Sequence, residues 1–106
     1  MLSGYRLMWL IVLFDLPVTT KKDRKIASKF RKTLVNIGYE MVQFSVYMKF
    51  AYSKEQSETI ISQLTQHTPA VGNVKIIRIT DKQFSQILHL GDHTPRQNQH
   101  TQLALF

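Results

Sequence analysis

The chain has 106 residues, which is enough for one domain with a hydrophobic core and too few for two. It contains no cysteine, so a disulfide framework and a thiolate metal site are excluded, and we expect a cytoplasmic protein. Fourteen Lys and Arg residues against seven Asp and Glu give a net charge of +7, which favours a polyanionic partner such as nucleic acid.

An uninterrupted apolar run from Leu7 to Phe14 leads to a single carboxylate, Asp15, and then to Pro17. The run is short and lacks helical spacing, so it predicts a strand over residues 6–14 that is buried on both faces. It is too short to span a membrane and has no small-residue cleavage site, so we expect no membrane anchor and no signal peptide. Asp15 is then placed where the chain leaves the sheet.

The following segment concentrates the positive charge. Thr20 and Asp23 resemble a capping box, which predicts a helix that runs to about Ile37 and is capped by Gly38. Seven basic residues and one acidic residue within positions 21–32 carry +6 of the net +7. Such a stripe is typical of a nucleic-acid-binding surface, and a merely solvated helix face is the alternative. The predicted nucleic-acid-binding residues are Lys21, Lys22, Arg24, Lys25, Lys29, Arg31 and Lys32.

The middle of the chain predicts two strands and a second helix. Residues 39–52 are rich in β-branched and aromatic types, which indicates either a tight hairpin or two strands joined by a kink near Ser45. Ser53 and Gln56 form a second capping pattern, and the helix that they open is expected to end before Pro69. Residues 74–79 predict a further strand, residues 81–84 a helical turn and residues 87–90 a short strand.

Aromatic side chains raise the question of a base-stacking surface. Phe44, Tyr47 and Phe50 lie within one extended region. No matching aromatic pair stands on the first strand, so we expect these three rings in the core. Trp9 is likewise expected in the core or at a subunit interface.

The order of elements is β, α, β, β, α, β, followed by a C-terminal strand. This order predicts an α+β ferredoxin-like sandwich with both helices on one face of an antiparallel sheet. We expect residues 1–90 to form the domain and residues 91–106 to form a flexible linker and tail. The apolar tail is predicted to dock on a sheet edge of this subunit or of a partner, and disorder is the alternative. Its docking residues are Leu103, Leu105 and Phe106.

Several segments together resemble one known family. They are Phe-Asp-Leu-Pro at 14–17, the basic helix, Gly-Tyr at 38–39 and Gln-Phe-Ser-Val-Tyr at 43–47. In this combination they resemble the CRISPR-associated endonuclease two family over essentially the whole chain. Thr-Asp-Lys-Gln-Phe at 80–84 and the polar linker are similar to members from single-effector, DNA-cutting systems. Met41 stands where many members have a basic residue, and Tyr47 replaces a common Phe.

The resemblance implies a homodimer with face-to-face sheets, whose last strand crosses to the other subunit. It also implies two activities. In the first, the dimer binds double-stranded DNA and bridges two dimers of the larger CRISPR integrase during spacer acquisition. In the second, the protein is a Mg²⁺-dependent endonuclease of single-stranded RNA or double-stranded DNA, with Asp15 as the metal-binding and catalytic residue.

We favour the bridging role because the sequence shows a dense stripe of basic residues, whereas it offers only one candidate catalytic residue, a single carboxylate. Mg²⁺ takes one or two carboxylates from protein, so a second Asp15 across a two-fold axis would be needed to complete a shared site. The structural alternative is that Asp15 accepts backbone N–H groups near Pro17 and caps its own loop.

Overall fold

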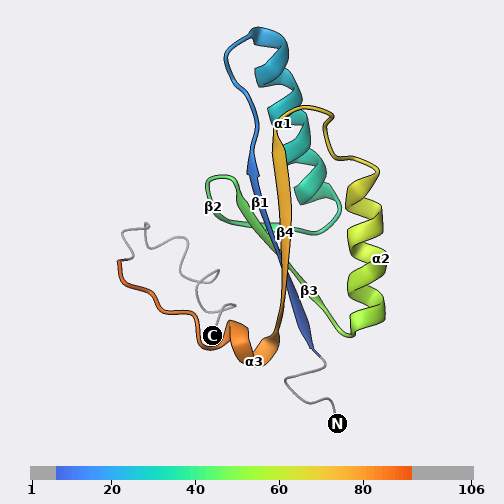
Figure 1. The fold of residues 1–106 in the computed structure, drawn as a ribbon, viewed down its shortest axis with the longest axis vertical. Coiled ribbons are helices and arrows are strands. Elements are labelled where there is room, and N and C mark those ends of the chain that lie inside the picture. The colour runs from blue at the N-terminus through green and yellow to red at the C-terminus, as the bar shows by residue number, and fades with distance from the viewer. Residues whose placement is uncertain (1–6, 92–106) are drawn as a thin grey trace.

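The computed structural model describes residues 7–91. One antiparallel sheet has the strand order β2-β3-β1-β4, so β1 is internal and β2 and β4 lie at the two edges (Figure 1). This is the predicted ferredoxin-like α+β arrangement. The apolar tail at residues 103–106, which is predicted to add a C-terminal strand, lies outside the described residues. The elements are β1 (Met8–Asp15), α1 (Lys21–Asn36), β2 (Glu40–Gln43), β3 (Val46–Ala51), α2 (Lys54–Thr65), β4 (Asn73–Thr80) and α3 (Asp81–Phe84).

The two faces of β1 have different surroundings. Leu10, Val12 and Phe14 point to one face and are buried in a core to which α1 and α2 contribute. The intervening apolar residues Trp9 and Leu13 point to the other face and are only half-buried. The expectation of burial on both faces is therefore wrong for the described chain, because both long helices pack on the same face. The core residues supplied by the helices are Ala27, Phe30, Leu34, Ile60 and Leu64.

The ends of α1 follow the predicted capping pattern. The Thr20 hydroxyl accepts the Asp23 N–H at 3.0 Å, and the Asp23 carboxylate accepts the Thr20 N–H at 3.4 Å. At the other end Gly38 has a φ of +102°, which lets its N–H and that of Tyr39 fold back onto helix carbonyls. The sequence around both ends thus fixes where the basic helix begins and stops.

The extended region forms a hairpin and not a kinked pair. Gln43 and Val46 are the last paired residues of β2 and β3, so Phe44 and Ser45 form the loop. Ser45 has a φ of +66°, a left-handed conformation that costs a non-glycine residue about 1 kcal/mol or more. The next predicted cap is also present, since the Ser53 hydroxyl accepts the Gln56 N–H at 3.0 Å.

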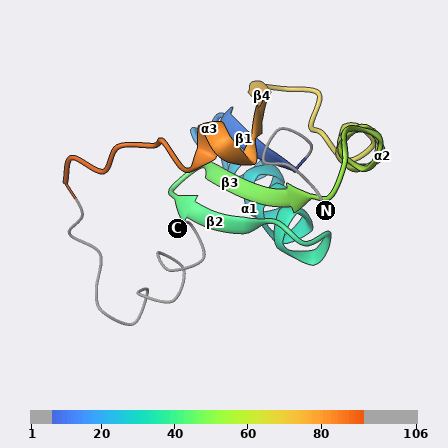
Figure 2. The same cartoon turned by 90° about the horizontal axis from the view of Figure 1, so that it is seen from below.

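The segment after β4 departs from the prediction. Residues 87–90 form no strand, and Leu88 and Leu90 are 81% and 95% exposed. The reason is the capping box of Thr80 and Gln83, which starts α3 at the end of β4 and turns the chain out of the sheet. Residues 85–91 then run away from the strands in both views (Figures 1 and 2). Apolar residues cannot form a strand without a neighbouring strand to pair with.

Short helix α3 covers one end of the sheet. The Trp9 indole stacks on the Phe84 ring with centroids 4.1 Å apart, and its N–H donates to the Asp81 carboxylate at 2.7 Å. Phe50 meets the same indole edge to face at 5.0 Å. Trp9 is thus packed by α3 and β3 beside the half-buried face of β1.

Candidate nucleic-acid interface

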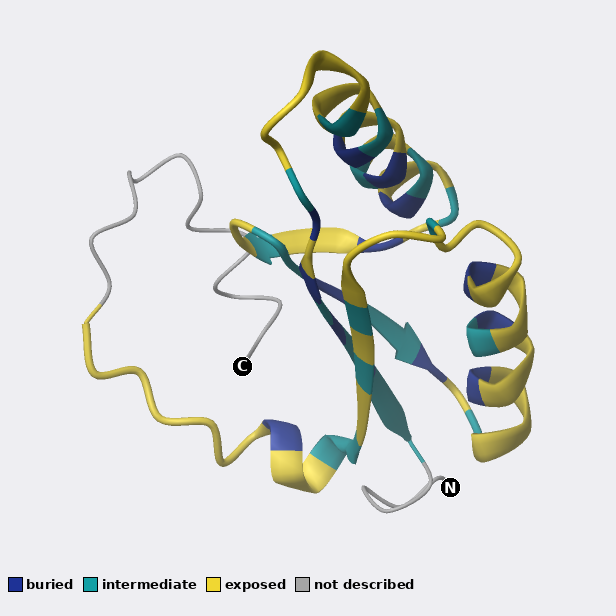
Figure 3. Ribbon diagram, turned by 45° about the horizontal axis from the view of Figure 1, so that its top comes forward, coloured by how far each residue is buried: buried dark blue, intermediate teal, exposed yellow. Residues whose placement is uncertain are grey.

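The outward side of α1 carries a continuous stripe of exposed lysines. Lys21, Lys25, Lys29 and Lys32 fall within an arc of about 80° on the helix, on the side opposite the buried residues. We call these four residues the α1 lysine stripe. No carboxylate in residues 7–91 lies within 4.0 Å of their ammonium groups. Figure 3 shows this outward side of the helix as exposed.

The placement of these charges does not serve helix stability. Cations are unfavourable at a helix N-terminus, where the helix dipole is positive, yet Lys21 and Lys22 open α1. The last turn of α1, where cations would be favourable, contains no basic residue. Lys21 and Lys22 therefore do not stabilise the helix through its dipole, and the stripe has no acidic partner in the described chain.

The other predicted basic residues have different surroundings. Lys22 is exposed beside the stripe. Arg24 donates from one guanidinium nitrogen to the carbonyls of Val18 and Thr19, both at 3.1 Å, and so holds the loop between β1 and α1. Arg31 is half-buried and points to the hairpin loop between β2 and β3. The seven basic residues therefore divide into five exposed lysines and two arginines with local contacts.

Asp15 is the last residue of β1 and pairs with Asn73 of β4. Its side chain is exposed and accepts no hydrogen bond from residues 7–91, so the loop-capping alternative is wrong for this part of the chain. Asp15 has the same parity along β1 as Trp9 and Leu13, which places its carboxylate at the edge of the face that the long helices leave uncovered.

The chain that passes Asp15 comes very close to it. Gly72 has a φ of +79°, and a side-chain carbon at this position would lie 2.7 Å from the Asp15 carbonyl oxygen. The same carbon would lie 2.9 Å from a Leu16 methyl group. Gly72 therefore allows the turn before β4 to pack directly on the backbone that carries Asp15.

Within one chain the residues around Asp15 do not complete a metal site. Residues 7–91 contain no cluster of three His, Asp or Glu side chains that could hold a metal ion. Mg²⁺ needs oxygen ligands and often keeps several waters, so one exposed carboxylate supplies only part of a site. A second carboxylate would have to come from another copy of the chain.

The hairpin loop beside Asp15 holds a group that the sequence analysis did not assign to the surface. Phe44 is 75% exposed, so the expectation that its ring lies in the core is wrong, whereas Tyr47 is buried as predicted. The Arg31 guanidinium lies 4.6 Å from the centre of the Phe44 ring and 6.0 Å from that of Phe14. The sequence left a hairpin and a kink as alternatives near Ser45. Of these, only a hairpin with a two-residue loop predicts that Phe44 is exposed.

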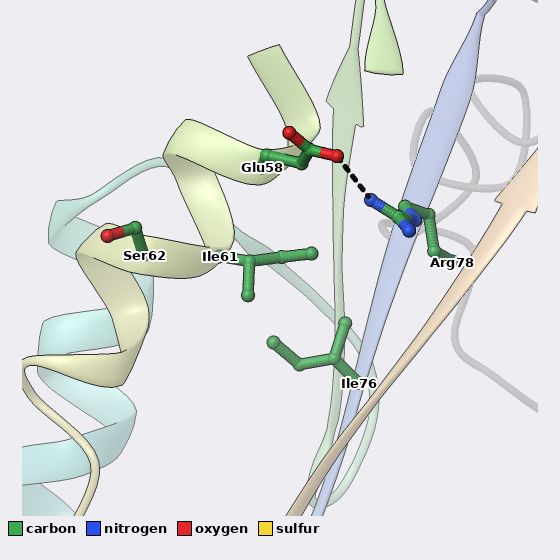
Figure 4. A pocket seen from close by; sticks show the side chains of 5 residues that line it. All are labelled: Glu58, Ile61, Ser62, Ile76 and Arg78. Carbon is green, nitrogen blue, oxygen red and sulfur yellow. Dashed lines mark ion pairs between the residues drawn. The ribbon is translucent and has the colours of Figure 1, made fainter. Parts of the chain in front are cut away.

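A shallow groove between α2 and β4 lies away from Asp15. Ile61 and Ile76 form its apolar floor (Figure 4). Arg78 lies at one end, where it pairs with Glu58 at 3.9 Å and donates to the Ser57 hydroxyl at 3.3 Å. Both charges of the groove are thus neutralised internally, which distinguishes it from the unpaired stripe on α1.

No helix within residues 7–91 is long and apolar enough to cross a membrane.

Comparison with known proteins agrees with this fold and places the chain in a family. The family model of CRISPR associated protein Cas2 matches residues 8–87. A CRISPR-associated endoribonuclease Cas2 of Paracidovorax avenae is 46% identical, and the alignment covers 100% of both chains. A second, of Flavobacterium psychrophilum, is 44% identical over 81% of this chain and 75% of the relative. A crystal structure of a Cas2 protein has a TM-score of 0.56 at 22% identity and covers 84% of this chain and 93% of that one, which supports the fold. The chain therefore belongs to the CRISPR-associated Cas2 protein family.

Proposed function

We propose that this protein binds double-stranded DNA through the α1 lysine stripe and, as a homodimer, bridges two dimers of the larger integrase subunit during CRISPR spacer acquisition. The observation that carries the proposal is the row of exposed lysines without an acidic partner in residues 7–91. Duplex DNA presents about one negative charge per 1.7 Å of its axis, so a straight row of cations is a suitable complement.

The uncovered face of the sheet supports the dimeric part of the proposal. Trp9, Ile11 and Leu13 are only half-buried there, and Ile77 of β4 is exposed. Apolar faces of this kind are normally covered by a partner. We propose that a second copy stacks on this face. In the same assembly, the tail residues Leu103, Leu105 and Phe106 would dock on a sheet edge of this subunit or of a partner, which includes the other subunit.

A charge-reversal variant tests the proposal. Replacing Lys25, Lys29 and Lys32 by Glu should abolish duplex binding and spacer integration with the larger integrase, because three phosphate contacts become repulsive. Asp15→Asn should leave both properties intact. Unchanged duplex affinity in the triple-Glu protein, with an unchanged circular dichroism spectrum, would contradict the proposal.

The second candidate is a Mg²⁺-dependent endonuclease in which Asp15 is the metal ligand. It is favoured by the exposed Asp15 carboxylate and by the relatives, which are named endoribonucleases. In a stacked dimer the Asp15 side chains of the two copies would together hold the ion, which supplies an activated water for phosphodiester hydrolysis. Asp15→Asn should then abolish Mg²⁺-dependent cleavage of single-stranded RNA without loss of duplex binding. Full cleavage by this variant would exclude Asp15 as the ligand.

A further inference from the structure

The loop between β2 and β3 presents an aromatic ring to solvent beside the basic helix. Phe44 is 75% exposed although it is a large apolar side chain. The other residue of the loop, Ser45, has a φ of +66°, a backbone conformation that residues other than glycine seldom adopt. Backbone strain of this kind persists where the surroundings enforce it, and it often marks functional positions.

The loop is anchored to the end of β1. The Phe14 N–H donates to the Ser45 carbonyl at 3.1 Å. Asp15 directly follows Phe14, and Phe44 directly precedes Ser45. The Asp15 carboxylate and the Phe44 ring thus belong to residues that adjoin the two ends of this hydrogen bond. The Phe44 ring is therefore held at the end of the sheet where Asp15 is exposed.

One side of the ring is backed by a cation from α1. The Arg31 guanidinium carbon lies 4.6 Å from the Phe44 ring centre, within the range of a cation–π contact. The Arg31 Nε atom is buried and has no hydrogen-bond partner among residues 7–91. The ring contact, and not a salt bridge, is thus what holds this guanidinium in the described chain. Because Phe44 is 75% exposed, much of its surface remains accessible to a ligand.

We infer that Phe44, backed by Arg31, is a stacking site for an unpaired nucleobase. Single-stranded nucleic acids are commonly bound by an exposed aromatic ring on which a base stacks, combined with cations that follow the backbone. Both parts are present here, because α1 carries Arg31, which contacts the ring, as well as the α1 lysine stripe, whose Lys32 side chain projects about 100° around the helix from that of Arg31. A strand whose phosphates lie on the stripe can place an unpaired base on Phe44, close to Asp15.

This inference rests on the proposed nucleic-acid-binding role of α1 and adds a base-stacking position beside it. A second copy of the chain is the competing occupant of the ring. The Arg31 Nε atom has no hydrogen-bond partner in residues 7–91, and lysines of α1 lie nearby. These charges favour a nucleic acid as the occupant, since an apolar protein surface would desolvate them without supplying a partner.

The test compares Phe44→Leu, which removes the aromatic face, with Phe44→Trp, which keeps it. Binding is measured by fluorescence anisotropy with a single-stranded RNA, a single-stranded DNA of the same sequence and a blunt DNA duplex. Phe44→Leu should weaken binding of the single strands about 5- to 140-fold, because stacking on one aromatic ring accounts for a loss of that size. Phe44→Trp should restore wild-type affinity, and the duplex should bind all three proteins equally well.

Further measurements separate the possible occupants. A 2-aminopurine at an unpaired position should be quenched by wild-type protein and by Phe44→Trp, and not by Phe44→Leu. The slope of log Kd against log salt should be the same in all three proteins, since no phosphate contact is removed. If Phe44→Leu loses affinity for only one of the two single strands, the result supports the stacking site and shows whether its base comes from RNA or from DNA.

Two results would overturn the inference. One is unchanged single-strand affinity in Phe44→Leu. The other is a change in oligomeric state by sedimentation velocity, which would make the ring a contact between copies. Failure of the proposed α1 role would be recognised separately. In that case the protein in which Lys25, Lys29 and Lys32 are replaced by Glu would still bind the duplex. The Phe44→Leu protein is judged only on its binding of single strands.

Discussion

The spacing of the α1 lysine stripe gives a quantitative prediction for its removal. Lys21 and Lys32 lie eleven positions apart, which corresponds to about 16 Å along a helix axis. One strand of B-DNA has a phosphate about every 3.4 Å of axis, so this length faces about five phosphates. The central lysines, Lys25 and Lys29, should each neutralise one of them.

Replacing Lys25 and Lys29 by Gln should therefore reduce the slope of log Kobs against log salt by about 1.8, since each phosphate contact contributes about 0.9. Between about 50 and about 200 mM salt, the wild-type protein should lose about twelvefold more affinity than this variant. Anisotropy titrations of a duplex at four salt concentrations measure the slope directly.

A matched control separates a local contact from net charge. Lys54 and Lys82 are also exposed and lie on α2 and α3. Their double Gln variant removes the same two charges from the net +7. It should keep a slope close to that of wild-type protein. Equal slope losses in the two double variants would refute the assignment of the stripe as the DNA-binding surface, because diffuse attraction depends on net charge and not on position.

Three further predictions concern stability. Burial raises the pKa of the Tyr39 phenol from 10.0 to about 12. The folded state thus holds this proton longer than the unfolded state, so stability is kept below pH 10 and falls by on the order of 2 kcal/mol as the pH rises to about 12. Urea titrations of wild-type and Tyr39→Phe protein should show this component in wild-type protein alone. Gly72→Ala should lower the free energy of unfolding by about 2 kcal/mol or more in the same assay, because its methyl group meets the Asp15 carbonyl and the φ of +79° is strained. Phe84→Ala should cost about 3 kcal/mol and shift the Trp9 fluorescence spectrum to longer wavelength, since the stacked ring that covers the indole is removed; an unshifted spectrum would mean that α3 does not cover Trp9 in solution.

The parts of the fold that were predictable are those set by local sequence. The capping residues Thr20 and Gly38 bound α1 as expected, because helix ends are decided within a few residues. The internal position of β1 followed from an apolar run that no surface strand would tolerate. The β, α, β, β, α, β order then left few alternatives to the ferredoxin-like topology.

The errors arose where the outcome depends on distant contacts. Ile87 and Leu90 have strand-like composition, yet α3 turns them away from any neighbouring strand. Phe44 is apolar and lies in a segment rich in β-branched and aromatic residues, yet the two-residue loop projects it outward. The proximity of Arg31 to this ring also depends on how α1 packs on the sheet, which a single sequence does not specify.

The two candidate functions draw on different sides of the sheet. The buried side of α1 packs with Phe14 in the core, so the lysine stripe faces outward from the helix-covered side. Asp15 lies at the edge of the opposite, uncovered side, where a second copy would bring its own carboxylate. A duplex on the stripe therefore has no need to reach Asp15, and binding can be retained without cleavage. The hairpin loop lies at the rim between the two sides, because Ser45 bonds to β1 while Arg31 of α1 backs Phe44. An unpaired base at this rim could approach both surfaces, and it would thereby connect the proposed duplex binding on α1 to the proposed chemistry at Asp15.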